Sequence, residues 1–126
     1  MFISNNKKEK GFLGEEYAVS YLLSKEFTVL ERNLSELYGE VDVVAIKEGT
    51  LHFVEVKSSF IEKNNESWSL TERVNKKKIN KINKVVCSYL ERKGKESSPW
   101  CIDIIAVYLS AEGDFVDLEM MENVVL

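Results

Sequence analysis

Two acidic residues and a lysine lie in stretches of the chain that are rich in strand-forming residues. Charged side chains in such stretches require a structural or functional explanation. Asp42 is the one charged residue of the apolar run 41–46, and Glu55 and Lys57 belong to the run 51–57. A glycine-containing turn separates the two runs, which predicts an antiparallel hairpin. If the loop has two residues, Asp42 faces Glu55 directly across the hairpin.

This pairing predicts a metal site. It brings two carboxylates to roughly 4.5–5.5 Å between Cβ atoms, a separation at which like charges repel. In a buried strand pair such repulsion calls for a bound cation, a shared proton or a compensating lysine. Oxygen ligands without cysteine or histidine partners suit Mg²⁺ or Mn²⁺. The backbone carbonyl of Val56, between Glu55 and Lys57, is a further candidate ligand.

Lys57 completes the candidate cluster. Period-two alternation puts it on the face of Glu55, about 6.8 Å further along the strand, where its ammonium could reach a bound water or a phosphate oxygen. Two alternatives stay open. A three-residue loop with a bulge would direct Asp42 and Glu55 to opposite faces. A salt bridge of Lys57 with Glu55 or Glu40 at the strand end would leave Asp42 exposed.

A helix over residues 10–25 is predicted from apolar positions that recur at helical spacing. At about 100° per residue, Glu15 shares the stripe of Ala18 and Leu22, whereas Glu16 falls on the far side. Glu15 is therefore expected to face inward.

The longest predicted helix covers residues 70–93 and ends before Gly94. Its apolar residues share one arc, and basic residues lie nearly opposite. The stretch 71–95 holds nine lysines and arginines against two acids, within a chain of net charge −4. This basic face could bind nucleic acid or could simply be solvated. Lys78 departs from the pattern, because its helical angle places it beside the apolar arc.

The predicted elements indicate an α/β protein with helices packed on a mixed sheet. Strands are expected over residues 27–30, 41–46, 51–57, 100–109 and 115–120. A polar turn is expected over 33–39, and a polar loop over 61–69 with Trp68 as its anchor. A length of 126 residues suits a single domain, 1–126, with a flexible N-terminal segment over 1–9.

Composition narrows the class further. The chain has neither an apolar run of roughly 20 residues nor the apolar stretch of a signal peptide, so a cytoplasmic protein without membrane contact is expected. Cys87 and Cys101 lie in apolar segments without C-x-x-C spacing, which favours small buried hydrophobes over zinc ligands or a disulfide. The one histidine, His52, faces away from Glu55 and is interpreted as a packing or surface residue.

The candidate residues resemble the D…E-x-K pattern of the PD-(D/E)XK nuclease superfamily, with twelve residues between Asp42 and Glu55. Residues 9–110 further resemble the small YraN-type family, which is related to archaeal Holliday junction resolvases and whose members are assigned as endonucleases by similarity. The positions that match, in the family's order, are Gly11, Gly14, Glu15, Ala18, Tyr21, Leu22, Arg32, Asn33, Gly39, Glu40, Asp42, 53–57, Lys78, Tyr89, Leu90 and Asp103.

The resemblance implies a restriction-endonuclease-like αβββαβ core and Mg²⁺-dependent hydrolysis of a nucleic-acid phosphodiester. It assigns metal binding to Asp42 and Glu55, orientation of the attacking water to Lys57, and support of the site or of a second ion to Glu15. Lys78 corresponds to the family's helix lysine. A metal and a fixed ammonium would act where negative charge develops in the transition state, which agrees with these roles.

Two positions depart from the family's usual pattern. Ser59 stands where a basic residue is usual, and Cys101 begins a Cys-Ile-Asp run where Arg-Phe-Asp is usual. Each missing charge removes a possible phosphate contact. Asp103, the last residue of that run, is interpreted as a structural residue that tethers a neighbouring loop.

The leading hypothesis is a Mg²⁺-dependent endonuclease that acts on structured or branched DNA through shape and phosphates, since no base-reading motif is visible. A homodimer would suit paired cuts in a four-way junction. The alternatives are a non-cleaving nucleic-acid- or protein-binding module on the same fold, and a phosphatase-like hydrolase of a small substrate. The candidate DNA-binding residues are Arg73, Lys77, Lys78, Lys81 and Lys84.

Overall fold

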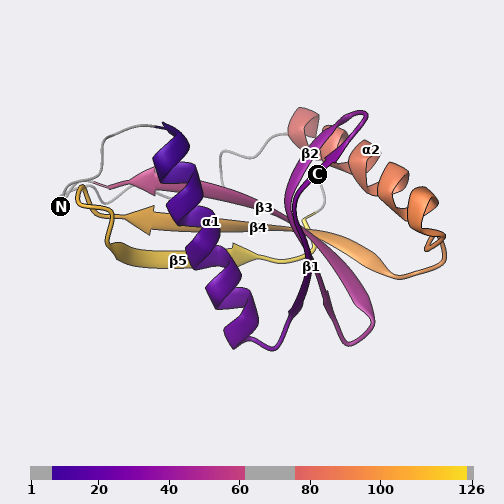
Figure 1. Cartoon of the computed structure of the whole chain (residues 1–126), viewed down its shortest axis with the longest axis horizontal. Helices are drawn as coiled ribbons and strands as arrows, with labels where there is room; N and C mark the ends of the chain where they lie inside the picture. Colours follow the sequence, from indigo (N-terminus) through magenta and orange to yellow (C-terminus); the bar gives the residue numbers. More distant parts are fainter. Residues whose placement is uncertain (1–6, 62–75, 125–126) are drawn as a thin grey trace.

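The computed structural model describes residues 7–61 and 76–124. These residues form two helices and five strands in the predicted order of helix, strand, hairpin, helix, strand and strand. The elements are α1 (Lys7–Ser24), β1 (Thr28–Glu36), β2 (Gly39–Lys47), β3 (Thr50–Phe60), α2 (Lys76–Lys93), β4 (Trp100–Leu109) and β5 (Phe115–Met121) (Figure 1).

The strands form one mixed sheet in the order β1-β2-β3-β4-β5. Among the described strands, β3 and β4 pair in parallel and each other neighbouring pair is antiparallel. A parallel pair needs a long crossover connection, and α2 lies within the segment that joins β3 to β4. The predicted α/β class, with helices packed on a mixed sheet, is therefore confirmed.

The turn between β2 and β3 sets the register of the hairpin. Glu48 and Gly49 form a two-residue loop with φ angles of 51° and 83°, as in the type I′ turns that match the twist of antiparallel strands. Val44 consequently pairs with Phe53, as the two-residue loop predicts. The predicted hairpin register is confirmed, and the bulged three-residue alternative is wrong.

The sheet separates two apolar cores. One core includes residues of α2 and alternate residues of the central strands: Val44, Leu51, Phe53, Ile82, Val86 and Tyr89. The other includes residues of α1 and the intervening strand residues: Ala18, Leu22, Val43, Val54, Ile105 and Val107. In Figure 1, α1 crosses β3 and β4, while α2 lies beside the β1–β2 end of the sheet. Neighbouring residues of one strand therefore serve opposite faces.

A polar contact fastens α2 to the first hairpin. Glu36, at the end of β1, has a side chain that is only 7% exposed. Its carboxylate accepts a hydrogen bond of 2.8 Å from Ser88 Oγ and one of 2.7 Å from Arg92 Nη2.

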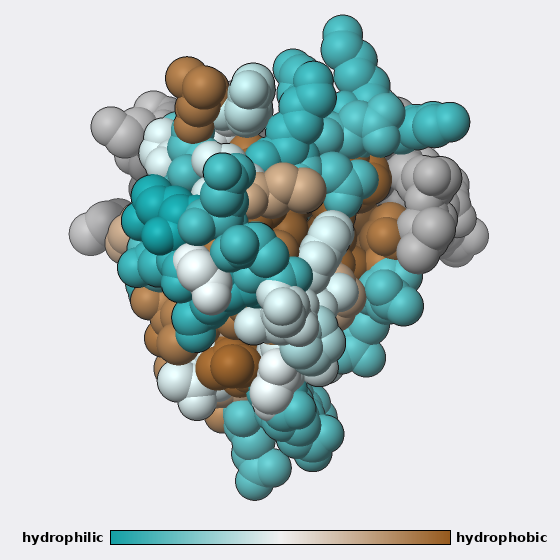
Figure 2. Space-filling model, turned by 90° about the vertical axis from the view of Figure 1, so that its right-hand side faces the viewer, coloured by the Kyte–Doolittle hydropathy of each residue, from teal (hydrophilic) through white to brown (hydrophobic). Residues whose placement is uncertain are grey.

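Figure 2 shows the end of the molecule at the right of Figure 1, where hydrophilic residues cover much of the surface and apolar residues show between them.

Helix α1 approaches β3 closely because position 14 has no side chain. A Cβ atom added to Gly14 would overlap the side chain of Ser58 on β3. The neighbouring glycine, Gly11, has open space around its Cα. The closeness of α1 to the sheet, and with it the position of Glu15, therefore depends on Gly14.

Some sequence predictions need correction. The turn expected over 33–39 is confined to residues 37–38, because Leu34 is buried and pairs with Val41, so that β1 continues to Glu36. Helix α1 begins at Lys7, within the segment 1–9 that was expected to be flexible. Cys87 is exposed and Cys101 only half-buried, so neither is the fully buried hydrophobe expected.

Several other predictions lie outside the described residues: the segment 1–6, the loop anchored by Trp68 and the first turns of the helix predicted from residue 70. Within the described ranges, neither helix combines the length and the apolar character that crossing a bilayer requires.

Candidate active site

The hairpin register places Asp42 beside the backbone of β3. The paired positions of β2 and β3 extend to Val43 and Val54, and Asp42 and Glu55 are the next residues beyond that pair. There the Asp42 side chain turns toward β3, and its Oδ2 accepts a hydrogen bond of 2.7 Å from the backbone N–H of Val56. The two acids that the sequence places opposite each other therefore meet at one point of the sheet.

The proximity of the acids is visible in the electrostatics of Asp42. Burial raises the pKa of Asp42 to about 6, and the negative charges of Glu55 and Glu15 add to the rise. The N–H of Val56 opposes the shift, because it stabilises the ionised carboxylate. Glu55 is itself buried, with 8% of its surface exposed. The ionised form of Asp42 is thus disfavoured first by burial and then by the neighbouring acids.

Two lysine amines lie against Glu55. Lys78 Nζ, from α2, is 2.7 Å from Glu55 Oε1, and Lys57 Nζ, from β3, is 3.7 Å from the same oxygen. Burial and the adjacent Lys78 lower the pKa of Lys57. Burial opposes the charge on Lys78, but the hydrogen bond to Glu55 and the negative charges of Glu55 and Asp42 together raise its pKa. The alternative in which Lys57 pairs with Glu55 while Asp42 stays exposed is therefore only half right, because Asp42 is partly buried and bonded to β3.

Glu15 reaches the same region from α1. Its side chain is 13% exposed, and Arg32 Nη2 on β1 lies 3.3 Å from its Oε1. The same guanidinium also contacts Glu16, at 2.5 Å. Because the charge of Glu15 contributes to the raised pKa of Asp42, the α1 carboxylate belongs to the electrostatic environment of the two strand acids.

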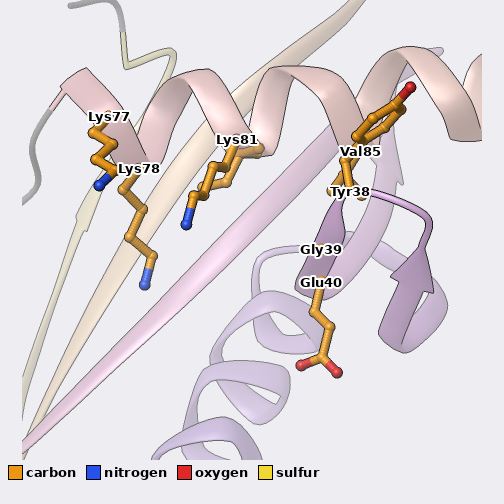
Figure 3. A pocket seen from close by; sticks show the side chains of 8 residues that line it. Tyr38, Gly39, Glu40, Lys77, Lys78, Lys81 and Val85 are labelled. Atoms are coloured by element: carbon orange, nitrogen blue, oxygen red, sulfur yellow. The ribbon is translucent and has the colours of Figure 1, made fainter.

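A groove beside these residues is lined by basic side chains of α2. It has a volume of about 450 Å³ and lies between α2 and the start of β2. Figure 3 shows the amines of Lys77, Lys78 and Lys81 extending from α2 on one side, with Glu40 on the other side of the groove. Lys78 therefore belongs both to the groove and to the cluster around Glu55. We call this cavity the basic groove.

The other two candidate DNA-binding residues lie elsewhere. Lys84 is on the next exposed turn of α2, where its Nζ stands 5.8 Å from the centre of the Tyr38 ring. Arg73 lies outside the described residues. The N–H of Val56 serves Asp42, while metal binding by the Val56 carbonyl stays a prediction.

A second polar cluster lies on the opposite face of the sheet. His52 Nδ1 is 2.6 Å from Asp103 Oδ2 and 3.1 Å from Cys101 Sγ. Asp103 Oδ1 also accepts a hydrogen bond of 2.9 Å from the N–H of Asn123, which confirms that Asp103 tethers a neighbouring segment. Sequence reasoning missed the cluster, because it depends on the parallel pairing of His52 with Cys101 across 49 positions. A partial signal was present, because two-residue alternation sets Cys101 and Asp103 on one face of β4.

Fold and site together define an α/β protein in which two carboxylates and two lysine amines meet beside a basic groove. The profile of the Uncharacterised protein family UPF0102 matches residues 14–107. The chain belongs to this family, which is the one that its motifs resemble.

Relatives in several bacteria match nearly the whole chain. A UPF0102 protein of Helicobacter pylori (strain P12) is 36% identical over 123 residues, which are 98% of this chain and 96% of the relative. A UPF0102 protein of Dictyoglomus turgidum is 36% identical over 118 residues, 94% of this chain and 98% of the relative. One of Campylobacter lari is 35% identical over 114 residues, 90% of this chain and 91% of the relative.

Proposed function

We propose that the protein is a metal-dependent endonuclease that hydrolyses DNA phosphodiester bonds. The observation that carries this proposal is the meeting of Asp42, Glu55, Lys57 and Lys78 next to the basic groove. A phosphodiester is anionic and becomes more so in the transition state, so its hydrolysis needs positive charge at the reacting phosphate and an oriented water. The cluster supplies groups of both kinds.

Mg²⁺ or Mn²⁺ fits the donors of this site. Asp42 and Glu55 offer carboxylate oxygens, and the Val56 carbonyl is a further hard oxygen on the same strand. Burial and the charge of Glu55 disfavour the ionised form of Asp42, and a divalent cation would stabilise that form. When bound, such a cation supplies Lewis-acid stabilisation of phosphate oxygens and lowers the pKa of water.

Each side chain of the site has a separate task in this proposal. Asp42 and Glu55 hold the cation, and Lys57 orients the water whose oxygen attacks phosphorus. The Lys78 amine, which contacts Glu55, would shift part of this contact to a non-bridging phosphate oxygen. Glu15 adds negative charge behind Asp42, where it strengthens cation binding.

The substrate class follows from the groove. Lysine amines bind phosphates as point charges and read no base, so binding depends on backbone shape and salt concentration. We propose structured or branched DNA as the substrate, with a homodimer as the form that makes paired cuts. A cytoplasmic location is part of the same proposal.

A second candidate is a nucleic-acid- or protein-binding module that does not cut. One observation favours it: Lys78 already neutralises Glu55 at 2.7 Å, so one acid of the pair is satisfied without a metal. In this case the basic groove binds phosphates or an acidic partner, and the acids only position the lysines.

Cleavage assays separate the two candidates. The purified chain is incubated with branched, single-stranded and linear DNA in the presence of Mg²⁺ or Mn²⁺, alongside Asp42→Asn and Lys57→Ala. Glu48→Gln is the matched control, because Glu48 is an exposed acid in the turn between β2 and β3 and lies outside the groove. We expect Asp42→Asn and Lys57→Ala each to lower the cleavage rate by at least about 100-fold, and Glu48→Gln to change it little.

The other outcomes are equally informative. Cleavage that persists in both site variants would come from a contaminating nuclease. Binding to branched DNA without products in either metal would establish the non-cleaving module. Neither binding nor cleavage at low salt would favour a protein-binding role.

A further inference from the structure

The face of the sheet opposite Glu55 carries three potential metal ligands. Parallel pairing sets His52 beside Cys101 and Val54 beside Asp103, so the side chains of His52, Cys101 and Asp103 project to one face. Their nitrogen, sulfur and oxygen atoms all lie within 4.8 Å of one another. This cluster shares no residue with the candidate active site.

The spacing of these atoms is close to that of ligands around one ion. With zinc bonds of about 2.0–2.3 Å, tetrahedral ligand atoms lie roughly 3.3–3.7 Å apart. Cys101 Sγ is 3.4 Å from Asp103 Oδ1 and 3.1 Å from His52 Nδ1. The contact between His52 and Asp103, at 2.6 Å, is a hydrogen bond that has to open by several tenths of an ångström.

The surroundings hold the three groups in place. Asp103 is fully buried, and the N–H of Asn123 donates to its Oδ1. The ring of Phe27 packs edge-on against His52, with ring centres 4.9 Å apart. Because neighbouring groups already hold these side chains, less conformational entropy is lost when an ion binds.

The cluster is also accessible and faces further negative charge. On the same face, Phe27, which contacts His52, and Glu122 line a cavity of about 180 Å³, which gives a path from solvent. Glu122 lies close enough for its charge to act on the Cys101 thiol. A divalent ion would therefore enter through a polar opening and meet a net negative environment.

We propose that His52, Cys101 and Asp103 form a zinc site, with a fourth position open to water or to Glu122. Imidazole, thiolate and carboxylate are the usual zinc ligands, whereas Mg²⁺ binds oxygen and disfavours sulfur. Binding releases the Cys101 thiol proton to solvent, and His52 binds as a neutral imidazole through Nδ1 with its one ring proton on Nε2. Such an ion would join the N-terminal parts of β3 and β4 on the face opposite the candidate active site.

Cobalt spectroscopy tests the site directly. The full chain is stripped of metal with a chelator and titrated with Co²⁺, which takes the place of zinc and reports a cysteine ligand through a thiolate-to-metal absorption band. We expect this band at one equivalent per chain, unaffected by excess Mg²⁺. Zinc should displace the cobalt and abolish the band.

Matched variants assign the band to its residues. Cys101→Ser should abolish it, while Cys87→Ser, which removes the exposed cysteine, should leave it unchanged. His52→Gln should weaken Co²⁺ binding at least tenfold, a loss typical of removing a ligand or its orienting partner. Asp42→Asn should leave the band and its stoichiometry unchanged, which separates this site from the candidate active site. Circular dichroism checks that each variant is folded.

Three results would overturn the proposal. The absence of a thiolate band in the unaltered chain at saturating Co²⁺ would exclude Cys101 as a ligand without the need for any variant. An equal band in Cys101→Ser would place the ion elsewhere. A Co²⁺ affinity that falls in Asp42→Asn but stays unchanged in His52→Gln would assign the cobalt to the carboxylate pair.

Discussion

Lys78 Nζ lies 2.7 Å from Glu55 Oε1, closer than the amine of Lys57 on the same strand as Glu55, which is 3.7 Å away. The principal partner of this buried carboxylate therefore comes from α2, on which Lys77 and Lys81 also line the basic groove. A cation that binds Glu55 has to share it with Lys78 or displace the amine. Metal binding and the position of the Lys78 side chain are consequently linked.

This link predicts that Lys78→Met has opposite effects on Mn²⁺ binding and on DNA binding. Removing the competing amine should tighten Mn²⁺ binding severalfold, because the carboxylates lose a positive neighbour. The same change should weaken DNA binding and lower the slope of log K against log salt by about one, as for the loss of one phosphate contact. Titration calorimetry with Mn²⁺ and salt-dependent gel shifts measure the two effects.

Lys77→Met is the control for that prediction. Lys77 precedes Lys78 on α2 and also lines the groove. It should lower the salt slope by the same amount and leave Mn²⁺ affinity unchanged. Equal Mn²⁺ affinities for the two variants would contradict a linkage through Glu55.

Asp42 makes stability depend on pH in an unusual direction. Its pKa rises from 3.8 to about 6 on folding, so the folded chain keeps a proton between these values that the unfolded chain has lost. The stabilisation from this proton is complete below pH ~4 and is lost as the pH rises through about 6. The full effect amounts to at most about 3 kcal/mol, which burial of only part of the group reduces.

Urea denaturation in the presence of a chelator measures this effect. Wild type should lose free energy of unfolding relative to Asp42→Asn between pH 4 and pH 7, since asparagine has no proton to lose. Parallel stability curves would show that the carboxylate titrates normally. Mn²⁺ competes with the same proton, so its affinity should rise up to tenfold per pH unit below pH ~6 and level off above it.

The two glycines of α1 should respond in opposite ways to alanine. Gly14→Ala places a methyl group against Ser58, where the close contact of α1 with β3 leaves no space, and should cost about 1–3 kcal/mol. Gly11→Ala meets open space in a helix and should add roughly 0.5–1 kcal/mol. Urea midpoints at constant m-value decide the comparison, and a destabilised Gly11→Ala would show that α1 is constrained at both positions.

Arg32 should act on the candidate site through Glu15. Arg32→Gln removes the contacts to Glu15 and Glu16 and should change the free energy of unfolding by less than about 1 kcal/mol, because the Arg32 and Glu16 side chains are exposed. If the proposed cleavage holds, kcat should fall while KM stays unchanged. Glu16→Gln, which leaves the contact between Arg32 and Glu15, should retain kcat.

Local periodicity carries much of the fold and part of the candidate site. The two-residue loop at Glu48 and Gly49 fixed the pairing of β2 with β3, so the meeting of Asp42 with Glu55 followed from strand geometry. The helical angle of Lys78 placed it beside the apolar arc, and it indeed contacts Glu55. These relationships lie within single elements or across one tight turn, where the local pattern is decisive.

Relationships that require distant elements to meet were not accessible in this way. The polar residues around Leu34 indicated a turn, but Leu34 is buried and pairs with β2, so the strand continues past it. The contact of Gly14 with Ser58 depends on how closely α1 packs on β3. The cluster of His52 with Cys101 depends on which strands pair in parallel, and period alone does not specify a partner.

The alternation of β3 has a consequence for how its length can vary. Glu55 and His52 are three positions apart, so they fall on opposite sides of the sheet and serve two chemically different surroundings. Insertion or deletion of a single residue between them would rotate one of the two groups into the wrong layer, whereas a change of two would preserve both orientations. Natural variants of this strand should therefore differ in length by even numbers, and odd changes should be compensated by a bulge.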